Sequence, residues 1–179
     1  GKREESEMAK ADNIILIGMP GAGKSTIGRL LAERLGYAFT DSDNLICERE
    51  GRSLSRIIEE DGLENFLRIE EEVNAGIQAE KSVIATGGSV IYGARAMEHL
   101  GKSGKIVYLR LSCPELERRL SDLRGRGVAI REGLTFRDLY EERTPLYERY
   151  ADIIVDLDGK DTEGALSALT EKLEQRPEL

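Results

Sequence analysis

The chain of 179 residues carries a formal net charge of −8, and its hydrophobic content is 40%. This length favours one domain with a full core, and the hydrophobic content excludes a disordered chain. No apolar run approaches the roughly 20 residues that span a bilayer, and an acidic surface argues against nucleic-acid binding. Cys47 and Cys113 have neither metal-ligand spacing nor a disulfide framework, which favours a reducing compartment. We therefore expect a cytoplasmic monomer that binds neither membranes nor nucleic acid.

The first half of the chain alternates between predicted strands and helices. After a charged segment, residues 1–12, which we expect to be flexible, a strand is predicted over 14–17 and a helix over 23–35. A second strand over 37–40 precedes two short helices over 43–50 and 53–60. A longer helix is predicted over 63–80, because its apolar residues are spaced to share one face.

The second half continues this alternation. Strands are predicted over 82–85, 105–109 and 153–155, and a last helix over 162–173. Residues 112–115 fit a capping box with proline in the first turn, and Thr135 begins another helix. Strands that are apolar throughout and are separated by helices indicate a parallel sheet covered on both faces. The expected fold is a three-layer α/β sandwich around a five-stranded parallel sheet.

The segment from Gly18 to Thr26 joins the first strand to the first helix with the spacing G-x-x-x-x-G-K-S of a phosphate-binding loop. Glycines let backbone amides turn toward phosphate oxygens, and the following helix adds partial positive charge at its N-terminus. Lys24 then reaches the β- and γ-phosphates, and the Ser25 hydroxyl binds Mg²⁺. The predicted nucleotide-binding residues of this loop are Gly21, Ala22, Gly23, Lys24, Ser25 and Thr26. The alternative is a glycine-rich turn without a ligand.

Three further segments belong to the expected site. Asp41-Ser42-Asp43 and Thr86-Gly87-Gly88-Ser89 each follow a predicted strand, so they are expected at the same rim of the sheet as the phosphate loop. Residues 124–133 are rich in arginine and glycine and lack a period. We predict a mobile lid over about 124–134, whose arginines meet phosphate charge on closure. An exposed basic loop is the alternative.

A short chain with a P-loop NTPase pattern, a lid and no N-K-x-D motif indicates a small-molecule kinase. From Ile14 to Leu173 the chain resembles the shikimate kinase family. The segments that carry this resemblance are 18–28, 41–43, Phe66, 85–88, 143–147 and 150–152. We therefore expect a single P-loop kinase domain over residues 13–175, with ATP and Mg²⁺ as cofactors and a small-molecule hydroxyl acceptor as partner.

The resemblance implies a role for each matching nucleotide-side residue. Lys24 resembles the lysine that cradles the phosphates, and Ser25 resembles the Mg²⁺ ligand. Asp41 is similar to the aspartate that holds Mg²⁺ through water. Arg119 aligns with an arginine near the adenine and phosphates, and Arg126 with the catalytic arginine of the lid. Alternatively, Asp41 could only cap the next helix, and Arg119 could be a solvated charge.

The acceptor side is implied in the same way. Asp43 is similar to the catalytic aspartate that contacts the reacting hydroxyl, as orienter or base. Gly87 and Gly88 match the loop on the substrate side, and Arg143 matches the arginine that pairs with the substrate carboxylate. Each has an alternative: Asp43 as a helix cap, the glycines as a tight turn, and Arg143 as a surface residue before a helix-breaking Thr-Pro.

The chain departs from the family pattern on the acceptor side. The carboxylate-binding arginine expected after Phe66 is Leu67, the third glycine of the substrate loop is Ser89, and the lid's Arg-Pro-Leu is Arg126-Gly127-Val128. Arg68 is next to Leu67, but one residue turns a helical side chain by about 100°. Another cation, Arg68 or Arg131, would have to complete the clamp if shikimate is bound.

These observations predict Mg-ATP-dependent phosphorylation of a hydroxyl on a small polar metabolite. The resemblance implies conversion of shikimate to shikimate 3-phosphate. One alternative is a related enzyme that acts on another small hydroxy compound, such as a hydroxy-amino acid or a sugar acid. Others are a nucleotide-binding protein without catalysis and a nucleoside monophosphate kinase. Retention of five matching residues argues against a protein without catalysis; these are Lys24, Ser25, Asp41, Asp43 and Arg126.

Overall fold

The computed structural model describes residues 12–121 and 133–175. Within these ranges, five parallel strands form a sheet in the order β2-β3-β1-β4-β5. The strands are β1 (Asn13–Ile17), β2 (Ala38–Asp41), β3 (Ser82–Ala85), β4 (Gly104–Arg110) and β5 (Ile153–Asp156). The predicted flexible segment falls outside the described residues, apart from Asp12, and so does the predicted lid up to residue 132.

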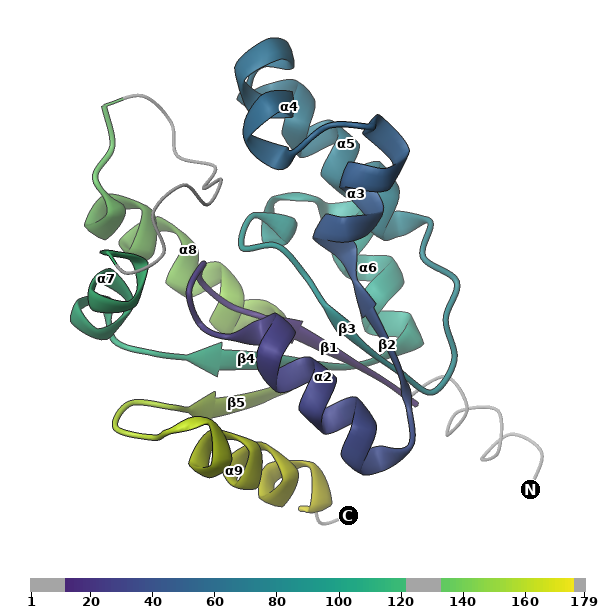
Figure 1. Cartoon of the computed structure of the whole chain (residues 1–179), viewed down its shortest axis with the longest axis vertical. Helices are drawn as coiled ribbons and strands as arrows, with labels where there is room; N and C mark the ends of the chain where they lie inside the picture. The colour runs from purple at the N-terminus through teal and green to yellow at the C-terminus, as the bar shows by residue number, and fades with distance from the viewer. Residues whose placement is uncertain (1–11, 122–132, 176–179) are drawn as a thin grey trace.

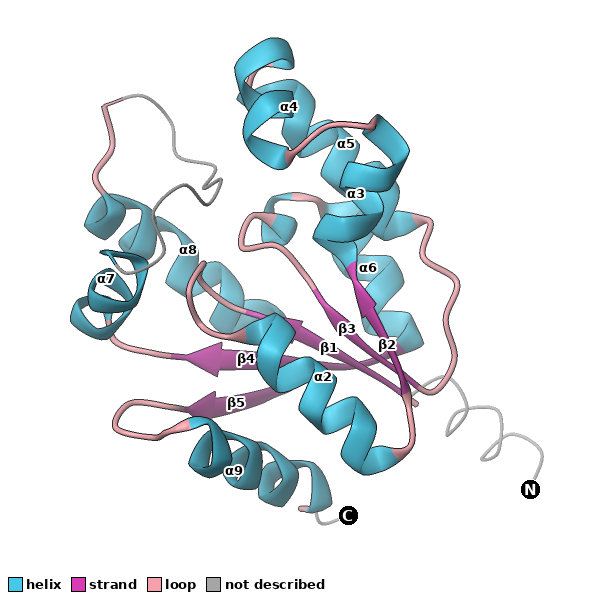
Figure 2. Cartoon of the chain, in the orientation of Figure 1, coloured by secondary structure: helices cyan, strands magenta, loops and turns pink. Residues whose placement is uncertain are grey.

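Helices cover both faces of this sheet (Figures 1 and 2), which confirms the predicted three-layer sandwich. Helices α2 and α9 lie on one face, and α6 and α8 on the other. Helices α3, α4 and α5 extend as a group beyond the carboxyl end of β2. Their bounds are α2 (Lys24–Leu35), α3 (Ser42–Glu50), α4 (Leu54–Asp61), α5 (Leu63–Ala75), α6 (Ala94–Ser103), α7 (Cys113–Ser121), α8 (Phe136–Tyr150) and α9 (Thr162–Glu174). Over the described ranges, no helix is long and apolar enough to cross a membrane.

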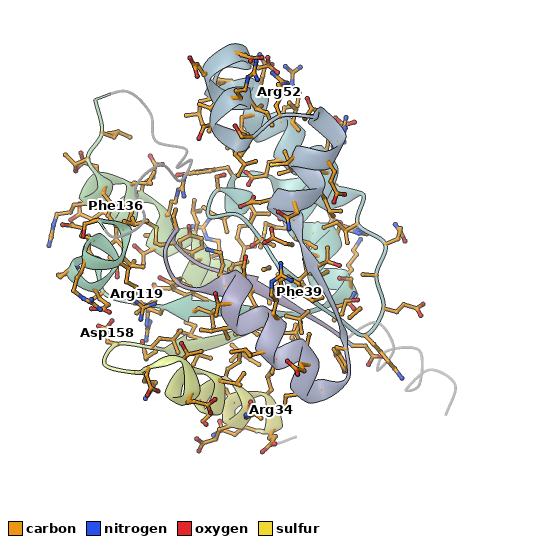
Figure 3. All side chains as sticks on the ribbon, in the orientation of Figure 1. Arg34, Phe39, Arg52, Arg119, Phe136 and Asp158 are labelled. Carbon is orange, nitrogen blue, oxygen red and sulfur yellow. The ribbon has the colours of Figure 1, made fainter. Side chains whose placement is uncertain are left out.

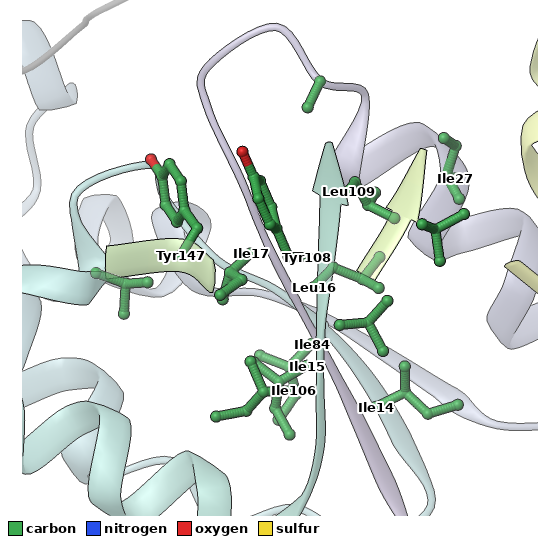
Figure 4. Packing of buried hydrophobic residues seen from close by; sticks show 14 of the residues in the cluster. Ile14, Ile15, Leu16, Ile17, Ile27, Ile84, Ile106, Tyr108, Leu109 and Tyr147 are labelled. Atoms are coloured by element: carbon green, nitrogen blue, oxygen red, sulfur yellow. The ribbon is translucent and has the colours of Figure 1, made fainter. Parts of the chain in front are cut away.

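Strand β1 shows why the strand sequences lack a polar face. All five of its residues are buried. Figure 4 shows Ile15 and Ile17 on the side of Tyr147 from α8, whereas Ile14 lies on the side of Ile27 from α2. Successive side chains of a strand point to opposite faces of the sheet. Because helices pack on both faces, both sets of side chains are removed from water. The continuous apolar run Ile14–Ile17 is the consequence.

The predicted helix over 63–80 is too long. Helix α5 ends at Ala75, where the Gly76 N–H bonds to the carbonyls of Glu72 and Val73 and tightens the last turn. Ile77 is buried, as its place on the apolar face suggested, but it lies beyond the helix. Its carbonyl instead contacts Nε2 of His99, 2.6 Å away on α6. Tertiary packing therefore overrode the helical spacing.

Other helix boundaries also differ from the predictions. Helix α6 and the short 3₁₀ helix η1 (Val90–Tyr92) were not predicted. The capping box at 112–115 was wrong, because the Ser112 N–H donates to Asp158 Oδ1 at 2.9 Å, while Glu115 accepts from Arg118 and Arg119. A full capping box forms instead where α8 begins, between Thr135 and Asp138.

The three-helix extension α3–α5 has its own ion-pair cluster at its far end. Arg52, labelled in Figure 3, donates to both carboxylate oxygens of Asp61, at 3.0 and 2.8 Å. The same guanidinium bonds to Glu50 and Glu60. Ile46, Ile57 and Phe66 form a separate buried cluster beneath it. This extension therefore has its own packing and carries Asp43 and Phe66 toward the phosphate loop.

Candidate active site

The phosphate loop connects β1 to α2 and curls around the Lys24 side chain. Gly21 and Gly23 have φ values of 88° and 86°, a conformation that favours glycine. A Cβ on Gly18 would lie 2.8 Å from the Leu109 carbonyl oxygen, so glycine also allows a close approach to β4. Nζ of Lys24 donates to the carbonyls of Gly18 at 2.7 Å and Met19 at 2.9 Å. The loop thus holds a buried cation against two of its own carbonyls.

Ser25 and Asp41 lie together although 16 positions separate them. The Ser25 hydroxyl donates to Asp41 Oδ2 at 2.7 Å, and Asp41 Oδ1 accepts from the backbone N–H groups of Asp43 and Asn44. Asp41 therefore caps α3, as the alternative interpretation held, and also faces the loop. A hydroxyl and a carboxylate are oxygen ligands that suit Mg²⁺, which usually takes one or two protein ligands besides phosphates and water. The donor set fits the predicted metal.

Arg119 lies over the phosphate loop from α7. Its Nη1 is 3.5 Å from the Gly21 carbonyl oxygen, and its Nε donates to Glu115 at 3.1 Å. Hydrogen bonds from Arg118 and Arg119 lower the pKa of Glu115 to about 2. Figure 3 shows Arg119 near the carboxyl end of β4, whereas the α3–α5 extension lies beyond the carboxyl end of β2. Its guanidinium is thus held against the phosphate loop, which counts against a fully solvated charge. Arg126, the predicted lid arginine, lies outside the described residues.

One cavity extends from the phosphate loop to Arg143 on α8. The cavity is open to solvent, and the space between its walls, including the part beyond its mouth, is about 710 Å³. Its lining includes Gly21, Gly23, Lys24, Ser25, Thr26, Asp43, Gly87, Gly88 and Arg143 from the predicted set, and also Leu54, Ile58, Phe66, Glu70 and Ser89. Of the other predicted residues that the structure describes, Ala22 is buried beneath the loop, and Asp41 and Arg119 flank the cavity. The fold therefore gathers the lining residues from six separate segments of the described chain.

Gly87 and Gly88 are needed for space. A Cβ on Gly87 would lie 2.6 Å from Asp43 Oδ1 and 2.8 Å from Glu70 Oε2. A Cβ on Gly88 would lie 2.8 Å from Nη1 of Arg143. The predicted tight turn is present, because the Val90 N–H donates to the Gly87 carbonyl at 3.2 Å, but neither glycine has a positive φ, so the turn alone does not require glycine. Their lack of side chains lets two carboxylates and one guanidinium close around the acceptor end of the cavity.

Arg143 occupies the middle of α8 and is 1% exposed. The alternative that it is a surface residue before a helix break is wrong, because α8 continues through Pro145. Its guanidinium lies 5.4 Å from the centre of the Tyr92 ring, a cation–π distance. Tyr147, one turn further along α8, donates to the Gly88 carbonyl at 2.5 Å. A buried cation thus faces the cavity from α8.

Glu70 was missed by the sequence analysis. It is 2% exposed, and the Ser89 hydroxyl donates to its Oε1 at 2.6 Å. Burial, together with the negative charge of Asp43, raises the pKa of Glu70 to about 7, although the Ser89 hydrogen bond opposes the shift. The available signal was its position four residues after Phe66, on the buried face of the same helix. An acidic residue on an apolar face points to a special environment.

The departures from the family pattern also have a place in the structure. Leu67 lines a small hollow with Leu63, Tyr92, Leu134 and Arg143, beside the main cavity. Arg68 is exposed and donates to Asn65, and it does not line the cavity. It is therefore not placed to substitute for an arginine at position 67. Arg131, the other candidate cation, lies outside the described residues.

Comparisons with known proteins agree on one family. The family model described as shikimate kinase matches residues 20–174. A shikimate kinase from Thiobacillus denitrificans is 37% identical over 171 residues, which cover 93% of either chain. A shikimate kinase from Methylococcus capsulatus is 41% identical over 153 residues, which cover 83% of this chain and 85% of the relative.

Solved structures lead to the same result. Shikimate kinase from Acinetobacter baumannii in complex with shikimate has a TM-score of 0.76 at 33% identity, covering 95% of this chain and 93% of that one. Shikimate kinase from Aquifex aeolicus has a TM-score of 0.75 at 31% identity, covering 90% and 96%. The chain therefore belongs to the shikimate kinase family, a family of small-molecule kinases.

Proposed function

We propose that this chain transfers the γ-phosphoryl group of ATP to the 3-hydroxyl of shikimate. The observation that carries the proposal is the shared cavity, which has Lys24 and Ser25 at one end and Asp43 and Arg143 at the other. A phosphate donor and a hydroxyl acceptor can meet there without crossing solvent. Relatives at 37% and 41% identity with the name shikimate kinase support this choice of acceptor.

On the nucleotide side, the loop amides and Lys24 would bind the phosphates, and Arg119 would contact the nucleotide above Gly21. Ser25 and Asp41 would hold Mg²⁺, which neutralises charge on the β- and γ-phosphates when it is bound. Phosphoryl transfer asks little covalent chemistry of a protein, so positioning and charge stabilisation carry most of the rate enhancement. Lys24 would supply positive charge as the γ-phosphoryl group leaves ADP. Arg126 is proposed to join it from the lid.

On the acceptor side, Asp43 would orient the reacting hydroxyl and accept its proton on the carboxylate. The close packing of Gly87 against Asp43 fixes where this carboxylate lies. Arg143 would pair with the carboxylate of shikimate, because a guanidinium buried at this depth favours an anionic partner. The apolar wall of Leu54, Ile58 and Phe66 would keep water from competing as acceptor.

Leu67 is the observation that favours a second candidate, phosphorylation of a different small hydroxy acid. A leucine replaces the second arginine of the expected carboxylate clamp, and Arg68 is bonded to Asn65 outside the cavity. An acceptor that carries no negative charge on the Leu67 side would fit the pocket equally well. Arg143 still favours an acidic acceptor, so this second candidate would also be a hydroxy acid, but a different one.

A phosphoryl-transfer panel tests the proposal. ADP formation is measured with Mg²⁺-ATP and each of shikimate, homoserine, gluconate and a nucleoside monophosphate, and the products are identified by mass. We expect shikimate to give the highest kcat/KM and a phosphorylated product. Turnover confined to homoserine or gluconate would establish the second candidate, and binding of ATP without any turnover would support a silent nucleotide-binding protein.

A further inference from the structure

A buried tyrosine hydroxyl connects the two ends of the cavity from beneath. Tyr147 is fully buried, and its hydroxyl donates to the Gly88 carbonyl, on the acceptor side, at 2.5 Å. The same oxygen lies 3.7 Å from the sulfur of Met19, in the phosphate loop. Tyr147 therefore contacts one segment from each end of the cavity, although neither segment is near it in the sequence.

The two segments also approach each other closely at Gly88. A Cβ on Gly88 would lie 2.9 Å from Cδ of Pro20 in the phosphate loop and 2.8 Å from Nη1 of Arg143 on α8. The phosphate loop, the loop after β3 and helix α8 thus meet at a residue that has no room for a side chain. Because the Tyr147 hydroxyl holds the carbonyl of this residue, it fixes the point where the two ends of the cavity touch.

The Tyr147 hydroxyl is also tied to Arg143, which lies one turn earlier on the same helix. Burial raises the pKa of Tyr147, and the positive charge of Arg143 and a hydrogen bond from its guanidinium oppose this shift. The hydroxyl therefore keeps its proton under physiological conditions. It can donate this proton to Gly88 while its oxygen accepts from Arg143.

Filling of the core does not account for this hydroxyl. The Tyr147 ring packs against the ring of Tyr108 on β4, with 5.1 Å between the ring centres (Figure 4). A phenylalanine ring would make the same contact without removing a hydroxyl group from water, which is costly unless that group is hydrogen-bonded. The contacts to Gly88, Met19 and Arg143 are what the hydroxyl adds.

We propose that Tyr147 is a positioning residue for phosphoryl transfer, whose hydroxyl sets the position of Gly88 and Arg143 relative to the phosphate loop. The inference rests on the proposed function, because transfer requires the acceptor oxygen to lie in line with the γ-phosphorus. Gly88 and Arg143 belong to the acceptor side, and the loop holds the donor. Slow hydrolysis of ATP by water, in the absence of an acceptor, would depend on the nucleotide end alone.

The test compares these two reactions in matched variants. Phosphorylation of the best acceptor from the panel and acceptor-free ATP hydrolysis are measured in the wild type, Tyr147→Phe and Tyr140→Phe. Tyr140→Phe is the control, because the Tyr140 hydroxyl also donates from α8 to a backbone carbonyl, that of Leu111, at 2.9 Å. Met19→Leu is a second variant, which removes the sulfur contact and keeps an apolar side chain. Thermal unfolding and ATP binding are measured for every variant.

We expect Tyr147→Phe to lower kcat for transfer by about tenfold to a hundredfold, while ATP affinity and the hydrolysis rate stay within about twofold. The acceptor KM should rise by about threefold to tenfold, because Arg143 loses a neutral hydrogen-bond partner. Tyr140→Phe should lose thermal stability without a change in either reaction. Met19→Leu should lower the ratio of transfer to hydrolysis less than Tyr147→Phe does, and it decides the result if Tyr147→Phe fails to fold.

Three outcomes would overturn the positioning role alone. The first is an unchanged ratio of transfer to hydrolysis in the folded Tyr147→Phe and Met19→Leu variants. The second is an equal fall of this ratio in Tyr140→Phe, which would indicate a general effect of lost stability. The third is a parallel fall of transfer and hydrolysis in Tyr147→Phe, which would restrict the hydroxyl to the nucleotide end. Absence of wild-type transfer to every acceptor of the panel would instead overturn the proposed function, and the inference with it.

Discussion

The nucleotide end and the acceptor end of the cavity are built in different ways. The nucleotide end comes from one continuous segment, Gly18–Thr26, whose backbone groups surround the Lys24 amine. The acceptor end comes from side chains on four separate elements: Asp43 on α3, Glu70 on α5, Ser89 after β3 and Arg143 on α8. One end depends on backbone shape, and the other on which side chains distant segments bring together.

This difference accounts for where the chain departs from its family. Phosphate binding by backbone amides requires a loop conformation that favours glycine at positions 21 and 23, so the loop has little room to change without losing its function. An acceptor is recognised by side chains, and a substitution there changes specificity without disturbing the nucleotide. Ser89 lines the acceptor end of the cavity, and Leu67 lines the small hollow beside it. We therefore expect variants at the acceptor end to lower the rate of phosphoryl transfer while ATP affinity stays the same.

Lys24→Met should have the largest effect. Removing the loop cation deprives the transferring phosphoryl group of charge stabilisation, so kcat should fall by about a hundredfold to a thousandfold or more. Steady-state kinetics and circular dichroism measure the change and the fold. Lys102→Met is the matched control, because Lys102 is exposed and pairs with Glu98 on α6. A folded Lys24→Met enzyme with near-native turnover would contradict the assignment of the nucleotide end.

Asp43→Asn should have the second-largest effect on activity. It removes the proton acceptor but keeps the size of the side chain, so transfer should fall by about a hundredfold or more while the ATP dissociation constant stays within about twofold. Asp41→Asn provides the contrast, since it should weaken the Mg²⁺ dependence of ATP binding through the Ser25 pair. Equal losses of ATP affinity and transfer in Asp43→Asn would move Asp43 to the nucleotide end.

Gly87→Ala tests the space at the acceptor end. The new Cβ would meet Asp43 Oδ1 and Glu70 Oε2 at distances that force both carboxylates to move. We expect kcat/KM for the acceptor to fall by about tenfold to a hundredfold, with ATP affinity unchanged. Gly101→Ala on α6 is the control, because its Cβ would make only an ordinary contact with Ile106. Unchanged acceptor kinetics would show that the carboxylates need not lie where the structure places them.

Leu67→Arg should have the smallest effect of the four variants, but it tests directly whether the acceptor end lacks a second cation. An arginine at this position lies on the face of α5 that carries Glu70, next to Arg143 across the small hollow. We expect KM for shikimate to fall by about tenfold, because a second cation joins the carboxylate clamp, while kcat and ATP affinity stay the same. A wild-type KM already in the micromolar range, with no gain in the variant, would show that the native pocket is complete without it.

Much of the nucleotide end could be predicted from the sequence. A phosphate loop is contiguous, its glycines are required by local backbone conformation, and its strand and helix have their own apolar patterns. The acceptor end could be predicted only through resemblance, and only where residues match. Glu70 has no local signature beyond its place after Phe66, since its state depends on Ser89, 19 positions away. The pKa of a buried carboxylate is set by neighbours that the chain brings from elsewhere.

The five strands, most of the helices, the parallel sheet and the phosphate loop could be read from the sequence, because each follows from apolar periodicity or from backbone requirements within a few residues. The kinase class came from the combination of motifs and from the family resemblance. The tertiary structure alone decided that α5 stops at Ala75, that Arg143 is buried within α8, and that the β2-β3-β1-β4-β5 order places the loop from β1 between the ends of β3 and β4. It also decided that Asp43 and Glu70 share Gly87 as a neighbour. The burial of a residue and its neighbours in space depend on segments that are distant in the sequence, so a local sequence pattern cannot predict them.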